Sequence, residues 1–436
     1  MEMKEMPFIS TRAKSMQRYT SRQDKYLTRL KANPFHKTKN PQGIIEMMTS
    51  ENPLAFDLLK EKLEEKESYN ILQEHTQYFC CEGLESFREA IADFLNHYMK
   101  PVEPILAENL IVSNGCTPIL DSLGYVIADA GEGLLIPSPF YGSFTLDFQT
   151  RSRVIPFPVP LSSEIGPGET QPFELTVARL ECALKKATEQ GVKIRGLLLC
   201  NPNNPLSTTY SEELLQDCLK FAARHSLHVI VDEVYMLCGF KEGCSVTNVL
   251  SLKSSVPDKK MIHVIWGFSK DFGLSGFRCG VLHTLNKDVY QAISSGYSRF
   301  QDLPTPTQIL LTNLIKDKDW LDESFIPTNQ KRLRNAHQMA CDALHEVGIP
   351  VLPGECGLYI WVDFREVLPT NTFEGEMELF DRFLDNGVAF YPGAWFLCAE
   401  PGWFRLVFAM ESEILQLGLS RIQQTVRQAR ADIASG

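Results

Sequence analysis

Four residues of chemically capable types follow short apolar runs of the chain. Asn204, Asp232 and Lys270 each come soon after the end of such a run, and Arg278 lies eight residues beyond Lys270. A lysine amine can attack a carbonyl carbon and can afterwards act as a base. A guanidinium pairs with phosphate or carboxylate oxygens. Because these polar segments follow the apolar runs, they are the first candidates for a ligand site.

Each segment taken alone also has an ordinary structural interpretation. Residues 201–205 read Asn-Pro-Asn-Asn-Pro, which is typical of a turn because proline fixes φ and asparagine bonds its own backbone. An aspartate at a strand end often caps the next helix. The intervals of 28, 38 and 8 residues from Asn204 to Asp232 to Lys270 to Arg278 are what favour one shared site.

The apolar runs predict the elements that would position these residues. Each run is three to five residues long and rich in Leu, Ile or Val, as expected for strands that are buried on both faces. Residues 211–225 lie between two runs and carry apolar side chains at helical spacing. This alternation predicts an α/β fold with a mostly parallel sheet, in which ligands bind beyond the carboxyl ends of the strands. The runs are 110–112, 134–136, 197–199, 229–231 and 264–266.

The pattern changes after about residue 310, which predicts a second, α+β domain. Residues 329–347 and 412–429 read as helices and 357–362 as a strand, whereas the Pro-, Ser- and Gly-rich region 144–173 reads as strand and loop connections. We expect residues 1–75 to form an N-terminal arm and part of the small domain. Residues 76–310 would form the large domain, and 311–436 the rest of the small one.

Composition excludes several classes of protein. The 436 residues are 44% hydrophobic and 22% charged, as in a soluble globular chain. The net charge of −11 disfavours nucleic-acid binding, and no apolar run is long enough to span a membrane. Twelve scattered cysteines predict reduced thiols in the cytoplasm and no metal site. The basic stretch 11–39 reads as a solvated helix. The alternative, a transit peptide, is disfavoured by the acidic residues at the start.

The chain resembles class-I aminotransferases that use pyridoxal phosphate (PLP), in which Asn, Asp-x-x-Tyr, Ser-Lys and Arg occur in this order and near this spacing. The resemblance implies fold-type I and a homodimer that acts on a small-molecule substrate, an amino acid. The residues that carry it are Asn204, Asp232, Tyr235, Ser269, Lys270 and Arg278.

The resemblance implies a role for each residue. Lys270 would form a Schiff base with the cofactor aldehyde and, once freed by substrate, act as a base. Asp232 would keep the pyridine nitrogen protonated, which with Lys270 and Tyr235 completes the catalytic set. Asn204 and Tyr235 would bond the ring hydroxyl. Arg278 would hold the phosphate.

Further cofactor contacts are expected upstream. Gly115, Cys116 and Thr117 follow an apolar run and precede a predicted helix, whose N-terminal N–H groups can cradle a phosphate. An ordinary strand-to-helix turn is the alternative interpretation. By resemblance, Tyr141 would stack on the cofactor ring, and Ser269 joins the cofactor-binding residues.

Within class I, the flanking motifs are close to those of 1-aminocyclopropane-1-carboxylate (ACC) synthases. Their residues are most similar to those of the vertebrate ACC-synthase-like branch. The similar segments are 33–47, 50–52, 269–278 and 400–405, and the resemblance covers about residues 19–430. It implies that Arg405 binds the substrate carboxylate in a bidentate pair. Glu51 would help to position a substrate such as S-adenosylmethionine.

Four positions depart from the plant-type pattern. Cys81 replaces a Tyr that would reach the phosphate of the partner subunit, Gly267 replaces a Ser, Pro118 replaces a small residue, and Ser207 replaces a Gly. Lost donors of this kind cost about 1–3 kcal/mol each when the site is dry. We therefore expect weaker cofactor binding.

Three functions follow from these observations. The first is an active PLP enzyme that transaminates amino acids or catalyses an elimination, and the second is true ACC synthesis. The third is an inactive homologue that keeps PLP and serves a binding or regulatory role. The retained Lys270, Asp232, Tyr235 and Arg405 favour catalysis, whereas Cys81 and the other departures disfavour ACC synthesis.

Overall fold

A large mixed sheet organises the first part of the chain. The computed structural model describes residues 9–10, 13–14, 16, 24–66, 70–253 and 258–435. Within them, the sheet has the strand order β2-β8-β7-β6-β5-β3-β4, and only β8 runs antiparallel to its neighbours. The predicted mostly parallel α/β sheet is therefore confirmed. The strands are β2 (Leu110–Ser113), β3 (Gly133–Ser138), β4 (Ile155–Pro160), β5 (Ile194–Cys200), β6 (His228–Asp232), β7 (Ile262–Gly267) and β8 (Gly280–Thr284).

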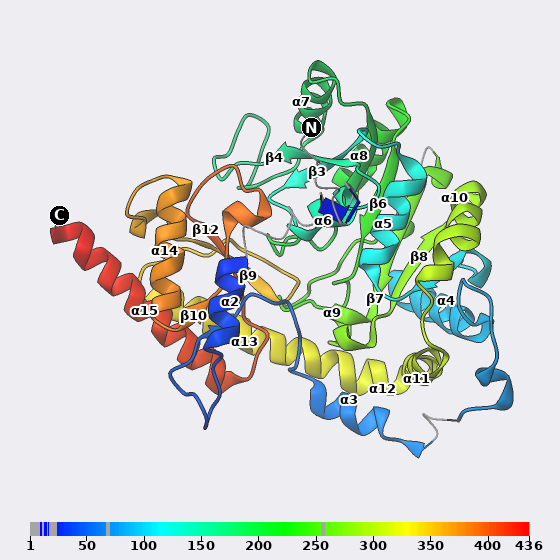
Figure 1. The fold of residues 1–436 in the computed structure, drawn as a ribbon, viewed down its shortest axis with the longest axis horizontal. Helices are drawn as coiled ribbons and strands as arrows, with labels where there is room; N and C mark the ends of the chain where they lie inside the picture. The colour runs from blue at the N-terminus through cyan, green and yellow to red at the C-terminus, as the bar shows by residue number, and fades with distance from the viewer. Residues whose placement is uncertain are drawn as a thin grey trace, which may run out of the picture.

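The central strands are buried on both faces because helices cover the sheet from both sides (Figure 1). In β5, Leu197 and Leu199 point into one apolar cluster, whereas Leu198 points into another, as the alternation of a strand requires. The flanking helices are α4 (Glu85–Met99), α5 (Cys116–Ile127), α6 (Ser143–Gln149), α7 (Val177–Glu189), α8 (Glu212–Arg224), α10 (Lys287–Ala292) and α11 (Thr305–Lys316).

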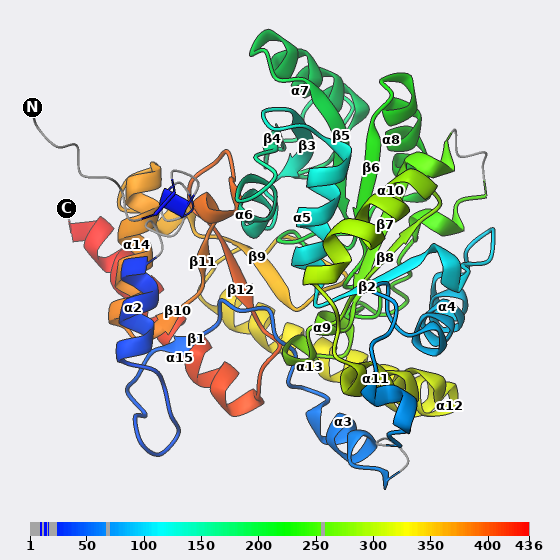
Figure 2. The ribbon, with the colours of Figure 1, turned by 45° about the vertical axis from the view of Figure 1, so that its right-hand side comes forward.

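A second group of elements combines both ends of the chain. The antiparallel sheet β11-β12-β9 and the parallel pair β1-β10 lie with α2, α13, α14 and α15 (Figure 2). One apolar cluster joins Tyr26 and Met47 to residues such as Leu344 and Phe404. The division of the chain into domains remains a prediction. The bounds are α2 (Asp24–Ala32), β1 (Ile45–Glu46), α13 (Ile326–Glu346), β9 (Tyr359–Asp363), α14 (Phe373–Asp385), β10 (Val388–Ala389), β11 (Tyr391–Pro392), β12 (Trp403–Val407) and α15 (Ser412–Ser435).

Several predicted elements are confirmed with shifted ends. Helix α8 is capped by Ser211, whose Oγ accepts from the Leu214 N–H at 3.1 Å. The other two predicted helices are longer than expected, since α13 begins at Ile326 and α15 continues to Ser435. Helix α2 lies inside the basic stretch 11–39, most of whose first half lies outside the described residues.

The prediction of only strands and loops for residues 144–173 is wrong in part. Helix α6 occupies the start of this region and buries Phe144, Asp147 and Phe148 along one side. The region also holds β4, which reads Ile-Pro-Phe-Pro-Val-Pro and lies at the edge of the sheet, where a strand can lack N–H donors.

Membrane-spanning helices and metal clusters are absent from the part of the chain that the structure describes. No described helix is long and apolar enough to cross a membrane. No group of three or more His, Cys, Asp or Glu side chains among these residues could hold a metal ion. All twelve cysteines are free thiols.

Candidate active site

The residues predicted to form the site come together beyond the carboxyl ends of β5, β6 and β7. Asp232 is the last residue of β6, and Asn204 lies in the turn that follows β5. Lys270 lies on the short helix α9 (Phe268–Asp271), which starts directly after β7. Because these strands are parallel neighbours, their ends lie at one edge of the sheet. Residues that are far apart in sequence therefore share one site.

The Lys270 amine lies in a largely enclosed position. Its Nζ donates to the backbone oxygen of Ser50 at 2.6 Å. Burial and the nearby Arg405 guanidinium lower the pKa of Lys270 to about 8. A substantial fraction of the amine is therefore neutral near physiological pH, the form in which a lysine is a nucleophile.

The Asp232 carboxyl is buried and has weak support from the protein. Its Oδ1 accepts only a long hydrogen bond, 3.4 Å, from the Val234 N–H. Burial raises the pKa of Asp232 to about 7, and the Lys270 charge opposes that rise. No ion pair involves Asp232 among the described residues. An added cationic partner would therefore be strongly favoured there.

Arg405 is a fully buried guanidinium on β12. Its Nη1 donates to the Asn204 Oδ1 at 2.9 Å, and its Nη2 donates to the backbone oxygen of Met48. The Asn204 Nδ2 lies 3.5 Å from the Tyr235 hydroxyl. The Arg405 Nε has no hydrogen-bond partner among the described residues, although it is buried. Arg405 is therefore oriented but keeps capacity to bind an anion.

Aromatic rings surround the Arg405 guanidinium. Its Cζ lies 5.0 Å from the ring centre of Tyr359, 5.3 Å from that of Tyr391 and 4.8 Å from that of Phe396. Such contacts stabilise a cation that has left water. Sequence reasoning missed these three residues and the carbonyl groups of Ser50 and Met48, because no local pattern marks a ring or a carbonyl that acts from a distant segment.

A second cation lies at the start of α5. Gly115 has a φ of 124° and immediately precedes that helix. A Cβ atom on Gly115 would lie 2.5 Å from the Arg278 Nη2, so glycine is required for Arg278 to approach the helix N-terminus. Arg278 forms no ion pair among the described residues. Free N–H groups and a guanidinium together suit a phosphate.

The remaining predicted residues lie at varying distances from this centre. Burial raises the pKa of Tyr141, and the Arg405 and Asp232 charges lie near enough to act on it. Glu51 accepts from the Ser275 Oγ at 3.0 Å and acts electrostatically on Lys270. Cys116 lies against β7, and its Sγ is 3.5 Å from the Trp266 oxygen.

Thr117 and Ser269 are brought near the site only through their neighbours. Thr117 is exposed, and Ser269 is half-buried beside Lys270. No side-chain contact of either residue joins it to Lys270, Asp232 or Arg405 within the described ranges.

The four departures from the plant-type pattern have local structural consequences. A Cβ on Gly267 would lie 2.8 Å from the Cys279 oxygen and 2.9 Å from the Cys116 Sγ. The space around this position therefore fits only glycine. Ser207 has a φ of 58°, and its hydroxyl donates to the Tyr359 oxygen at 2.6 Å, which offsets the strain.

The other two departures lie at the margins of the site. Pro118 stands in the first turn of α5, where an N–H has no acceptor within the helix, so the helix tolerates the proline while the cradle lacks one donor. Cys81 is half-buried, and Asp302 and Arg299 act on it electrostatically.

Comparison with known proteins identifies the family. Residues 44–422 match the model of aminotransferase class I and II. The chain is 44% identical to the human 1-aminocyclopropane-1-carboxylate synthase-like protein 1, over 90% of this chain and 78% of that protein. It is 41% identical to the human probable inactive 1-aminocyclopropane-1-carboxylate synthase-like protein 2, over 91% of this chain and 69% of that protein.

More distant relatives agree. The Arabidopsis thaliana 1-aminocyclopropane-1-carboxylate synthase 2 is 34% identical over 92% of this chain and 82% of its own length. A Thermus thermophilus aspartate aminotransferase has the same fold, with a TM-score of 0.76 at 19% identity, over 96% of this chain and all of that one. The expected fold-type I architecture is thereby confirmed. The chain belongs to the aminotransferase class I and II family and, within it, to the ACC-synthase-like proteins.

Proposed function

We propose that the protein binds PLP and acts on the α-amino group of an amino acid, by transamination or elimination. The residues fit this cofactor because a buried carboxyl, a lysine amine and a phosphate cradle converge at one sheet edge. Bound PLP supplies a ring that accepts electrons from the substrate α-carbon. Lys270 would hold the cofactor covalently, with Asp232 near the ring nitrogen and Arg278 near the phosphate.

One observation carries this proposal. Arg405 is buried, oriented by Asn204, and close enough to Lys270 to lower its pKa, yet its Nε has no partner among the described residues. A buried guanidinium without a carboxylate is costly unless a ligand completes it. An amino-acid carboxylate would do so and would bring the α-carbon toward Lys270. The freed Lys270 amine could then move a proton at that carbon.

The proposal does not extend to ACC synthesis. Gly267 and Pro118 remove two donors from the phosphate cradle, and Cys81 stands where a tyrosine would contribute one more. The second candidate function is an inactive homologue that retains PLP. It is favoured by these same departures and by the similarity to a relative named probable inactive.

We further propose a homodimer whose interface includes the surface around Cys81. Arg299 and Asp302 act on Cys81, and the Tyr125 and Tyr297 rings are 5.0 Å apart, so these segments are neighbours. Tyr125 is exposed, as is Phe300, which lies three residues after Tyr297. A contiguous exposed apolar patch on a monomer often marks a contact surface.

A substrate screen tests the function. The purified protein, saturated with PLP, is mixed with each of the common amino acids and with S-adenosylmethionine. Cofactor absorbance and products are then followed, and Arg405→Leu serves as the matched control. We expect at least one amino acid to change the spectrum and give a keto acid or an elimination product, and S-adenosylmethionine to give no ACC. Bound PLP with no response to any amino acid would support the inactive alternative. ACC formation would contradict the proposal that the protein does not synthesise ACC.

A further inference from the structure

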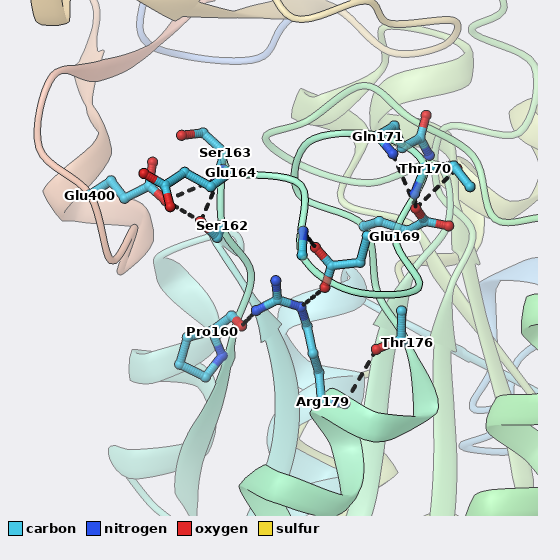
Figure 3. Close-up of polar contacts among 12 residues, drawn as sticks. Pro160, Ser162, Ser163, Glu164, Glu169, Thr170, Gln171, Thr176, Arg179 and Glu400 are labelled. Atoms are coloured by element: carbon cyan, nitrogen blue, oxygen red, sulfur yellow. Dashed lines mark hydrogen bonds and ion pairs between the residues drawn. The ribbon is translucent and has the colours of Figure 1, made fainter.

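Polar contacts fasten the loop that follows β4. Residues 161–175 connect β4 to α7, and Figure 3 shows their polar contacts. The Glu169 carboxylate accepts from the Arg179 Nε at 2.5 Å and from the Gly166 N–H at 2.9 Å. The Arg179 Nη1 donates to the Pro160 oxygen at 2.9 Å. The loop is therefore fastened to the strand before it and to the helix after it.

Glu400 joins this loop to the segment that leads into β12. Its Oε1 accepts from the Ser162 Oγ at 2.7 Å and from the Ser163 N–H at 2.9 Å (Figure 3). Burial acts to raise the pKa of Glu400, but hydrogen bonds from Ser163 and Ser162 hold it below its ordinary value. The carboxylate is therefore charged at neutral pH, and its hydrogen bonds are of the stronger, charge-assisted kind. Glu400 lies five residues before Arg405.

Aromatic packing continues the same connection toward Arg405. The Phe173 ring meets the Trp403 ring edge to face at 5.0 Å. Trp403 and Arg405 are two residues apart on β12, and Trp361 of β9 is the cross-strand partner of Arg405. All three side chains therefore lie on one face of the small sheet. The Trp361 and Trp403 rings are nearly parallel, at 4° and 6.0 Å between centres.

We propose that Glu400 is a positioning residue: by fastening loop 161–175 to the turn before β12, it fixes the Arg405 guanidinium relative to the large domain. This inference rests on the proposed function, in which Arg405 binds the substrate carboxylate. Asn204 and Met48 hold the guanidinium itself, whereas Glu400 and Trp403 hold the strand that carries it. Bidentate recognition of a carboxylate tolerates little displacement.

Binding of L-alanine to the PLP-loaded protein, measured by calorimetry, tests the position of Arg405. Glu400→Ala and Ser162→Ala remove the two sides of one hydrogen bond, so each should weaken L-alanine binding, Glu400→Ala by about tenfold. The double variant should bind no worse than Glu400→Ala, because one contact is lost only once. Glu400→Gln should keep most of the affinity, since its amide oxygen can still accept. PLP affinity should stay within about twofold of the parent in all of them.

A neighbouring glutamate supplies the control. Glu164 is exposed, and only its backbone N–H joins the cluster, donating to the Ser162 Oγ at 3.0 Å, so Glu164→Gln should bind L-alanine normally. If folded Glu400→Ala has a lower melting temperature but normal L-alanine affinity, Glu400 is merely structural and the proposal is wrong.

Hydrogen exchange of the PLP-free protein separates this proposal from the proposed function. Glu400→Ala should speed exchange at Ser163 and also in β12, because the two segments are held together. Faster exchange at Ser163 with unchanged β12 would overturn the coupling. If the parent protein binds no L-alanine, the proposed function fails, while the exchange result still decides whether Glu400 couples the segments.

Discussion

Burial shifts the two central titrating groups toward their neutral forms. The pKa of Lys270 falls to about 8 and that of Asp232 rises to about 7, in each case chiefly because the charged form loses water. Burial makes such a group reactive by shifting its pKa, and it also raises the free energy of the charged form when no partner is present. Two predictions follow at single residues.

Asp232→Asn should stabilise the PLP-free protein at pH 8. The folded pKa of Asp232 is raised from 3.8 to about 7, so the folded state holds a proton that the unfolded state has released. Stability therefore falls as pH rises from about 4 to about 7. The neutral amide removes this loss, with a gain on the order of 2–4 kcal/mol at pH 8 and little gain at pH 4. Thermal unfolding at both pH values checks this, with Asp217→Asn as control, because the Asp217 side chain is 43% exposed. A variant that is less stable at pH 8 would show that the charged carboxylate is satisfied.

Arg405→Leu should weaken amino-acid binding while PLP affinity stays almost unchanged. Arg405 is assigned to the substrate carboxylate and Arg278 to the phosphate, and removal of one partner of an enclosed pair costs about 2–5 kcal/mol. The Lys270 pKa should also rise, because the Arg405 charge helps to lower it. Equilibrium titrations with PLP and with an amino acid measure the two affinities. Loss of the cofactor with retained amino-acid binding would mean that the two arginines have been assigned wrongly.

At the scale of elements, the turn from β2 into α5 meets the end of β7 without spare room. Gly267 faces the Cys116 Sγ and the Cys279 oxygen, and a Cβ there would be too close to both. The space that a larger side chain at this position would need is therefore already filled, in part by Cys116.

Gly267→Ser should consequently destabilise the fold instead of restoring the phosphate grip. Overpacking of this kind costs about 1–3 kcal/mol. Adding Cys116→Ala should recover part of the lost stability. Full recovery is not expected, because the Cys279 oxygen is a backbone atom and would still be too close to the serine Cβ. Melting temperatures and PLP titrations of the single and double variants check this. Tighter PLP binding by the single variant at unchanged stability would contradict the packing argument.

The predictability of each element depended on the range of the interactions that form it. The central strands were predictable because β5, β6 and β7 are largely buried and each contains an unbroken run of three apolar residues. Helix α6 was missed because it has only seven residues, too few to show a period beside its prolines and glycines. The order of Asn204, Asp232 and Lys270 predicted that these residues share one site, and the structure brings them to one edge of the sheet. The ring of Tyr359, Tyr391 and Phe396 comes from tertiary packing alone.

At the scale of the whole molecule, the surface around Cys81 is the proposed dimer contact. Phe300 is 77% exposed and Tyr125 is 57% exposed. A second copy of the chain would cover such rings and gain the free energy of removing them from water.

Phe300→Glu should therefore weaken or abolish the dimer. A charge buried at the contact would be unpaired, and the cost would shift the equilibrium toward monomers. Phe56→Glu is the control, because Phe56 is also exposed, at 59%, but lies on α3 (Phe56–Leu63). Sedimentation equilibrium measures the masses. A monomeric parent protein would refute the proposed dimer, and a dimer that survives Phe300→Glu but not Phe56→Glu would place the contact elsewhere.

The central claim is that Lys270 is the residue that bonds PLP. Borohydride reduction of the PLP-loaded protein makes the bond permanent, and peptide mass spectrometry then locates it. We predict one PLP adduct per chain on the peptide that contains Lys270, and none when Lys270→Arg is treated in the same way. An adduct on a different lysine of the parent protein, or no adduct at all, would contradict the account.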